Sequence, residues 1–221
     1  MKRRFAFTLV EFLITIAIIG VVAAMTIPSL LQMYNNHITE IRLKKFYADF
    51  NNAIRMAEAD FGPSDYWSDY WELANGKSDT WKTGKAVEKY FAPYMKISKV
   101  KNINHAPVFE LPNGAAFGYP ATQVRDIYFY PKNYKKCKDG KVKGQCTFVF
   151  QFVPSSYTND KYWGRVRGKG LVPFLYLWNG TKAQLYSGGT YSCKNGGGYC
   201  VEIIRQNNWK IPKDYPCKIS Y

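Results

Sequence analysis

The chain has 221 residues, 47% of them hydrophobic and 17% aromatic, and its 31 Lys and Arg against 16 Asp and Glu give a formal net charge of +15. This apolar and aromatic content excludes a wholly disordered chain, and the length suits one domain with an appendage. The excess of positive charge is compatible with three kinds of partner: nucleic acid, an anionic membrane surface, or an acidic face of another protein.

The N-terminus is basic and then strongly apolar. Residues 2–4 are Lys-Arg-Arg, and Glu11 is the only formally charged side chain between residues 5 and 39. The apolar run over residues 12–31 would span about 30 Å as a helix, which is the thickness of a bilayer's hydrocarbon core. Basic residues ahead of such a run predict a single membrane span with a cytoplasmic N-terminus and an exported remainder.

Two ordinary explanations of this apolar run are incomplete. A cleavable secretory signal has an apolar run of only about 7–15 residues followed by a small-x-small site, and the run here is longer. A plain signal anchor fits the length but leaves Glu11 unexplained, because a charged side chain at membrane depth costs roughly 2.5–3.5 kcal/mol.

Residues 3–11 read Arg-Arg-Phe-Ala-Phe-Thr-Leu-Val-Glu. A basic leader, a small residue, a Phe-Thr-Leu-Val-Glu run and an apolar helix closely resemble the processing site of type IV prepilins and type II secretion pseudopilins. In that family a membrane peptidase cuts on the cytoplasmic side of the apolar run and methylates the new N-terminal amine. The resemblance implies a cut after Ala6, which stands where the family usually has Gly, and Phe7 as the mature N-terminus.

The resemblance also implies roles in assembly for Glu11, Gly20 and Pro28. After cleavage, the Glu11 carboxylate would pair with the Phe7 amine of a neighbouring subunit, which offsets much of the penalty that each desolvated charge carries alone. The alternative is a snorkelling or neutralised acid at the membrane interface. Fibre subunits of this family often carry Gly and Pro in a segment that loses helical order on assembly, although an ordinary proline kink explains Pro28 equally well.

The sequence predicts an α+β fold in four segments. The resemblance implies that residues 1–6 form a leader that is removed and that residues 7–31, the predicted membrane-spanning helix, form the fibre core. Residues 32–61 continue this helix with an apolar stripe at three- and four-residue spacing, whose partner would be the rest of the chain. A Gly-Pro pair ends the helix, and residues 62–221 form an exported head with an antiparallel β-sheet, as in pilins.

Strand and turn signals are frequent in the head. Apolar and β-branched residues on either side of Asn-Gly turns predict two hairpins, and further aromatic or β-branched runs predict three single strands. In chain order, the predicted segments are a helix over 85–95, a hairpin over 108–119, strands over 127–130 and 147–153, a hairpin over 174–186 and a strand over 201–204.

All five cysteines lie in the predicted exported head, where disulfides can persist. Short closing loops favour Cys137–Cys146 and Cys193–Cys200, and the second pair would fix a Gly-rich segment with little shape of its own. Cys217 would then be free or paired outside the chain.

The sequence carries no signature of catalysis. The two histidines, His37 and His105, each lack a second ligand at metal-binding spacing. No nucleophile elbow, P-loop or dinucleotide fingerprint occurs. Residues 162–221 contain only Glu202 and Asp214 as acids, so the calcium site of some pseudopilins is not expected. We therefore expect a non-enzymatic protein without a metal or cofactor.

Between residues 132 and 169, ten basic residues and two acidic ones are interleaved with aromatic rings. Such a basic loop can hold a nucleic-acid backbone, lie solvated, or match an acidic face of a neighbouring subunit. An acidic stretch without any base runs from Glu58 to Glu72. We rank subunit contact or plain solvation ahead of DNA. The residues predicted to make such contacts are Lys135, Lys136, Lys138, Lys141, Lys143, Arg165, Arg167 and Lys169.

These features predict a structural subunit, minor rather than major because of its length, of a type IV pilus or a type II secretion pseudopilus. Its partners would be prepilin peptidase, other pilin or pseudopilin subunits and an inner-membrane assembly platform, with DNA as a further partner through the basic loop. The protein would lie in a bacterial inner membrane and then in the fibre. The alternatives are a DNA-binding minor pilin of an uptake pilus and a membrane-anchored binding protein that never polymerises.

Overall fold

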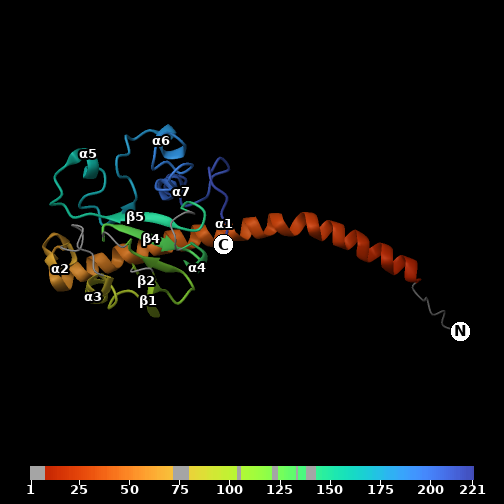
Figure 1. Ribbon diagram of the computed structural model, residues 1–221, viewed down its shortest axis with the longest axis horizontal. Helices are drawn as coiled ribbons and strands as arrows, with labels where there is room; N and C mark the ends of the chain where they lie inside the picture. The colour runs from red at the N-terminus through yellow and green to blue at the C-terminus, as the bar shows by residue number, and fades with distance from the viewer. Residues whose placement is uncertain (1–7, 72–79, 104–105, 121–123, 133, 138–142) are drawn as a thin grey trace.

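A computed structural model describes residues 8–71, 80–103, 106–120, 124–132, 134–137 and 143–221 of the chain. The dominant element is α1 (Leu9–Phe61), a single helix of 53 residues. Thr8 caps its first turn, and Gly62 ends it at a φ of +80°, a conformation that favours glycine. The second half of α1 lies along the head while its first half projects from it as a rod (Figure 1).

In the described ranges, six strands form one antiparallel sheet, and their order across the sheet is their order along the chain. The strands are β1 (Lys99–Ile103), β2 (Ala106–Glu110), β3 (Ala116–Gly118), β4 (Asp126–Tyr130), β5 (Phe148–Phe152) and β6 (Leu171–Pro173). The short helical elements are η1 (Ser64–Tyr66), α2 (Ser68–Trp71), α3 (Thr80–Tyr90), α4 (Tyr134–Cys137), α5 (Asp160–Trp163), α6 (Lys182–Tyr186) and α7 (Cys200–Gln206).

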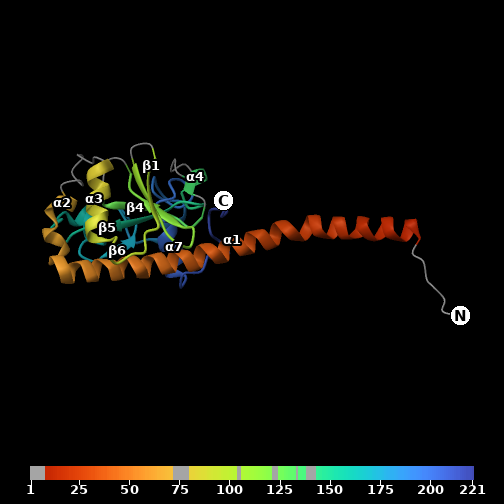
Figure 2. The ribbon, with the colours of Figure 1, turned by 90° about the horizontal axis from the view of Figure 1, so that it is seen from below.

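The sheet separates two packed layers. Because side chains alternate along a strand, Ile127 and Phe129 of β4 point into a core with Phe46 and Phe50 of α1. The opposite face of the sheet meets the C-terminal segment, where Val149 of β5 packs in a second buried cluster with residues from α6 and α7. Figure 1 shows α6 and α7 across β5 from α1, and Figure 2 shows α1 running under the length of the head.

The predicted α+β fold, with a long N-terminal helix on an antiparallel sheet, is confirmed. The predicted hairpin over 108–119 is present as β2 and β3, where Gly114 turns at a φ of +76°. The strands predicted over 127–130 and 147–153 are β4 and β5. The predicted helix over 85–95 begins earlier and ends at Tyr90, with turns continuing to Met95. Strands β1 and β6 were not predicted.

The predicted hairpin over 174–186 is wrong. Instead of a type I′ turn, Asn179 accepts hydrogen bonds from the Thr181 backbone and hydroxyl at 2.9 and 2.8 Å. Thr181 then caps α6 by accepting a bond from the Gln184 amide at 3.3 Å. Leu177, at a φ of +60°, turns the chain before this point. Polar capping therefore starts a helix where a second strand was expected.

The predicted strand over 201–204 is also wrong, since these residues belong to α7. The Glu202 side chain is only 1% exposed, and both nitrogens of the Arg205 guanidinium facing it donate at 2.7 Å. Gln206 adds a third hydrogen bond at 2.8 Å. Residues three and four positions apart are neighbours on the surface of a helix, so the helical conformation lets Arg205 and Gln206 satisfy the buried Glu202 carboxylate.

Candidate functional site

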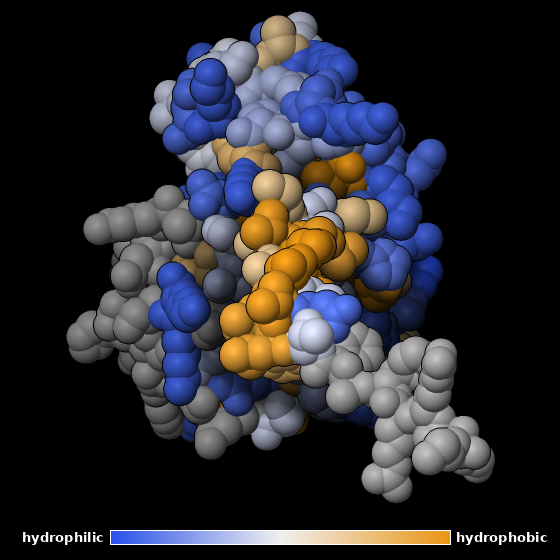
Figure 3. Space-filling model, turned by 90° about the vertical axis from the view of Figure 1, so that its right-hand side faces the viewer, coloured by the Kyte–Doolittle hydropathy of each residue, from blue (hydrophilic) through white to orange (hydrophobic). Residues whose placement is uncertain are grey.

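The first half of α1 is an apolar surface that the head does not cover. From residue 9 to residue 31 its large apolar side chains are 47–75% exposed. This part of the helix is long and apolar enough to cross a membrane. Seen end-on, the projecting helix is an apolar patch in front of a largely hydrophilic head (Figure 3). Such a surface in water would be costly, and it indicates a lipid or protein environment.

Contact with the head begins where the apolar run ends. The Gln32 amide donates to the Ile219 carbonyl at 3.3 Å, and the Thr39 and Tyr221 hydroxyls lie 2.5 Å apart. Thr39 is the first fully buried residue of α1. The C-terminus of the chain therefore fastens the point at which the helix leaves the head.

Polar side chains of α1 fix its register on the head. Among the described contacts, Arg42 donates to two backbone carbonyls, Glu40 accepts from Lys210 and from the Ile211 amide, and Asn51 both accepts from and donates to the backbone of Leu171. Sequence reasoning missed these three residues, because their partners lie 71 to 171 positions away in the chain.

Glu11 closes the first turn of α1 with Thr8. The Thr8 amide and hydroxyl both donate to Glu11 Oε2 at 2.8 Å, and the Glu11 amide donates to the Thr8 hydroxyl at 3.2 Å. This reciprocal pair is a capping box, which satisfies two helix-end donors at once. The role of Thr8 was missed, although the Thr-x-x-Glu spacing is the sequence signal for it.

Two other predicted assembly residues lie in the exposed half of α1. A Cβ on Gly20 would meet no atom within 4 Å, so no contact inside the subunit requires glycine there. Pro28 lies inside the helix, and its missing amide leaves one carbonyl of the preceding turn without its helical donor. Among the described residues, no packing contact within the subunit explains Gly20, and Pro28 is exposed. The roles of both residues in assembly stay predictions. The predicted processing residues Ala6 and Phe7 lie outside the described residues.

The structure divides the basic loop into two groups. One lies around α4, near the point where α1 leaves the head, and the other follows α5 at the far end (Figure 1). The first group holds Lys135, Lys136 and Lys143, the second holds Arg165, Arg167 and Lys169, while Lys138 and Lys141 lie outside the described residues.

The second basic group is engaged within the head. Arg167 pairs with Asp160 at 2.8 Å, Arg165 Nε donates to the Trp178 carbonyl at 3.0 Å, and Lys169 donates to the Arg165 carbonyl at 3.0 Å. Within the described residues, the two groups are separate rather than one groove of cations, which is the usual arrangement for holding a nucleic-acid backbone.

The acidic stretch also has partners inside the head. Burial raises the pKa of Asp69, but hydrogen bonds from Lys89 and Tyr90 outweigh it and leave that pKa below its ordinary value. The remaining described acids accept as follows: Glu58 from Ser64, Asp60 from Tyr94, and Asp65 from Ser155 and Ser156. Glu72 and the predicted surface residue His105 lie outside the described residues, whereas His37 is exposed.

The head holds disulfides between Cys137 and Cys146 and between Cys193 and Cys200. Cys217 is a half-buried free thiol, and its sulfur lies 3.8 Å from that of Cys193. Burial raises the pKa of Cys217. Since the disulfide uses the other two thiols of this group, the three sulfurs do not constitute a metal site in the oxidised protein.

Non-reducing peptide mapping of the full-length protein is expected to recover these two bridged pairs and an unbridged Cys217. Because its pKa is raised, the Cys217 thiol should be alkylated slowly at neutral pH in the folded protein and faster as the pH rises through that pKa. The reduced, unfolded chain is the control, in which all five thiols should react alike. A Cys217 bridged to Cys137 or Cys146 would contradict the assignment.

Comparisons with known proteins place these features in a family. The model of a family of unknown function (DUF6613) matches residues 29–219. The model of the prokaryotic N-terminal methylation motif matches residues 1–27, which include Ala6, Phe7, Glu11 and Gly20. No curated protein and no solved structure matches the chain. The motif is that of type IV prepilins and pseudopilins, so the chain is pilin-like at its N-terminus, and the motif implies processing by prepilin peptidase. It belongs to the DUF6613 family and carries the N-terminal methylation motif at its start.

Proposed function

We propose that this protein is a minor structural subunit of a type IV pilus or type II secretion pseudopilus, assembled through the first half of α1. The observation that carries the proposal is the continuous apolar surface over residues 9–31, which the head leaves uncovered at the end of the chain that bears the methylation motif. A membrane covers this surface before assembly, and neighbouring helices would cover it in a fibre.

The same surface and the methylation motif support a division of the chain into segments. Residues 1–6 would be removed as the leader, residues 7–31 would span the inner membrane, and residues 32–61 would join the span to the exported head of residues 62–221. An inner-membrane assembly platform would then lift the subunit out of the bilayer. The free-energy cost of this transfer is small because the helix exchanges contacts with lipid for contacts with other helices. Its apolar side chains therefore stay out of water throughout.

N-terminal sequencing and mass spectrometry of the mature protein are expected to find a chain that starts at Phe7 with a methylated amine. The control is an Ala6→Glu variant, whose large charged side chain at the cleavage position should block processing and leave residues 1–6 attached. A wild-type chain that keeps its leader would favour the non-polymerising anchored protein and contradict the proposal.

The DNA-binding alternative receives less support. The candidate cations that the structure describes are divided between the two ends of the head, and the group after α5 is bonded to neighbouring protein atoms. A retardation assay with the full-length protein in detergent at low salt tests it directly. Salt-sensitive binding that falls on changing Lys135 and Lys136 to Gln would restore this alternative.

A further inference from the structure

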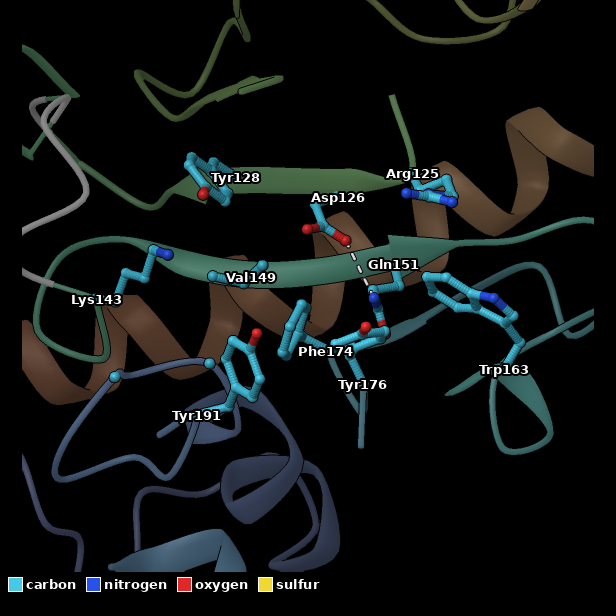
Figure 4. Close-up of a pocket in the computed structure, with 12 residues that line it drawn as sticks. Arg125, Asp126, Tyr128, Lys143, Val149, Gln151, Trp163, Phe174, Tyr176 and Tyr191 are labelled. Atoms are coloured by element: carbon cyan, nitrogen blue, oxygen red, sulfur yellow. Dashed lines mark hydrogen bonds between the residues drawn. The ribbon is translucent and has the colours of Figure 1, made fainter. Parts of the chain in front are cut away.

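A cavity of about 380 Å³ lies on the face of the sheet opposite α1. Its floor is made by neighbouring side chains of β4 and β5, because the register pairs Asp126 with Gln151 and Tyr128 with Val149. Figure 4 shows these residues facing the C-terminal segment. The volume is near the lower end of the roughly 300–1,000 Å³ that ligand pockets have, so it suits a small ligand.

The polar groups of this cavity include both signs of charge. Asp126 is 9% exposed, and its carboxylate accepts from Gln151 Nε2 at 3.0 Å. Gln151 is itself held, since its carbonyl oxygen accepts from the Leu175 amide at 3.0 Å. Arg125 and Lys143 line the same cavity on either side of Asp126 (Figure 4). Burial raises the pKa of Asp126, and these two cations oppose that shift.

Aromatic rings form the walls. The Arg125 guanidinium lies 4.7 Å from the ring of Trp163, and the Lys143 ammonium lies 5.0 Å from the ring of Tyr128. Tyr176 adds a further ring to the wall. Its backbone carbonyl accepts a hydrogen bond from the Tyr199 hydroxyl at 2.6 Å. The walls thus present flat, weakly negative ring faces beside fixed hydrogen-bonding groups.

A Gly-rich loop closed by the Cys193–Cys200 disulfide completes the cavity. A Cβ on Gly196 would lie 2.0 Å from the Thr190 carbonyl, and one on Gly197 would lie 2.3 Å from the Cβ of Lys143. Glycine is therefore required here for the close approach of the loop to the Lys143 side of the cavity. The disulfide holds the loop in this position, which preorganises the wall.

We propose that this cavity binds a sugar residue that carries a carboxylate. Arg125 covers one face of Trp163 and Tyr162 stacks on one face of Tyr176, so the remaining faces of these two rings would accept the C–H face of a sugar ring. The Asp126 carboxylate, which Gln151 holds in place, can accept hydrogen bonds from sugar hydroxyls. Arg125 or Lys143 pairs with the carboxylate, and two cations against one acid favour an anionic over a neutral sugar. The ligand site lies on the exported head, away from the apolar half of α1.

The test uses the full-length protein in a detergent without a sugar headgroup, with methyl glucuronide, methyl glucoside and acetate as probes. Saturable quenching of tryptophan fluorescence reports binding, because Trp163 lines the cavity. The glucuronide is expected to bind about tenfold or more tightly than either other probe, since a hydrogen bond to a charged group contributes roughly 1.5–3 kcal/mol. Equal binding of acetate, equal binding of the glucoside, or no saturation overturns the proposal.

Matched variants locate the site. Arg125→Gln and Lys143→Gln are expected to weaken glucuronide binding about tenfold. Their controls carry the same changes outside the cavity: Arg165 lies over Trp178 at 5.0 Å, and Lys182 lies over Tyr186 at 4.9 Å. Arg165→Gln and Lys182→Gln should leave binding unchanged. If the control variants lose as much affinity as the cavity variants, the site is elsewhere and the proposal is wrong.

Discussion

Glu11→Ala is expected to abolish fibre formation while leaving membrane insertion and cleavage intact. In the proposed fibre, the carboxylate neutralises the Phe7 amine of the next subunit in an apolar environment. Removing one partner of a buried ion pair costs roughly 3–5 kcal/mol, which would reduce assembled subunits at least about 100-fold. Quantifying the protein in sheared fibres and in the membrane fraction measures both effects at once.

The capping box makes a control necessary, because Glu11 also stabilises the start of its own helix. Thr8→Ala removes the cap, at a cost of about 1 kcal/mol, but keeps the charge. Fibres are expected from Thr8→Ala and not from Glu11→Gln, which keeps the shape of the side chain and removes its charge. Normal fibres from Glu11→Gln would show that the charge is not needed and that the carboxylate serves only as a cap.

The elements that could be predicted are those encoded by local pattern. Apolar spacing, a Gly-Pro stop and a basic leader define α1 without reference to any other part of the chain. The β2–β3 hairpin could be predicted equally well, because the Asn113-Gly114 pair specifies its turn locally. Such features depend on residues within one or two turns of each other, so a single sequence is enough to identify them.

The errors fall where distant contacts decide the conformation. Val201, Ile203 and Ile204 are β-branched and apolar, yet residues 201–204 lie in a helix because both faces of this helix are buried and Glu202 is satisfied at helical spacing. The Asn179-Gly180 pair resembled a hairpin turn, but the Thr181 cap starts α6 instead. The free energy that secondary-structure propensity contributes is small compared with that of these tertiary contacts.

The same reasoning explains which site residues were missed. Glu11 could be identified from its motif. Thr8 could have been identified from its three-residue spacing to Glu11. Asp126 and Gln151 are 25 positions apart, and only the register of β4 on β5 brings them together. A cavity of this kind has no sequence motif, because its chemistry is assembled from strands, a disulfide loop and a short helix that meet only in the fold.

Phe46→Ala is expected to destabilise the head by roughly 3–5 kcal/mol, the usual cost of emptying a buried phenylalanine site. The Phe46 side chain is 2% exposed and stacks on Phe129 with ring centroids 4.2 Å apart. It also meets Phe50, Phe117 and Phe150 at 5.5–5.6 Å. This residue is thus where the second half of α1 enters the core, and its loss leaves a cavity between α1 and the sheet.

Chemical unfolding in detergent, followed by tryptophan fluorescence, measures this effect, because Trp67 and Trp71 lie in the same core. The melting temperature should fall as well, by ~2–4 °C for each kcal/mol lost. Phe61→Ala is the matched control on the same helix, since Phe61 is 43% exposed, and it should cost less than about 1 kcal/mol. If Phe46→Ala costs as little as Phe61→Ala, the second half of α1 is not part of the head's core. A large loss confined to Phe46→Ala means that the second half of α1 is part of the head's core, so the helix proposed to assemble the fibre through its first half also stabilises the head through its second.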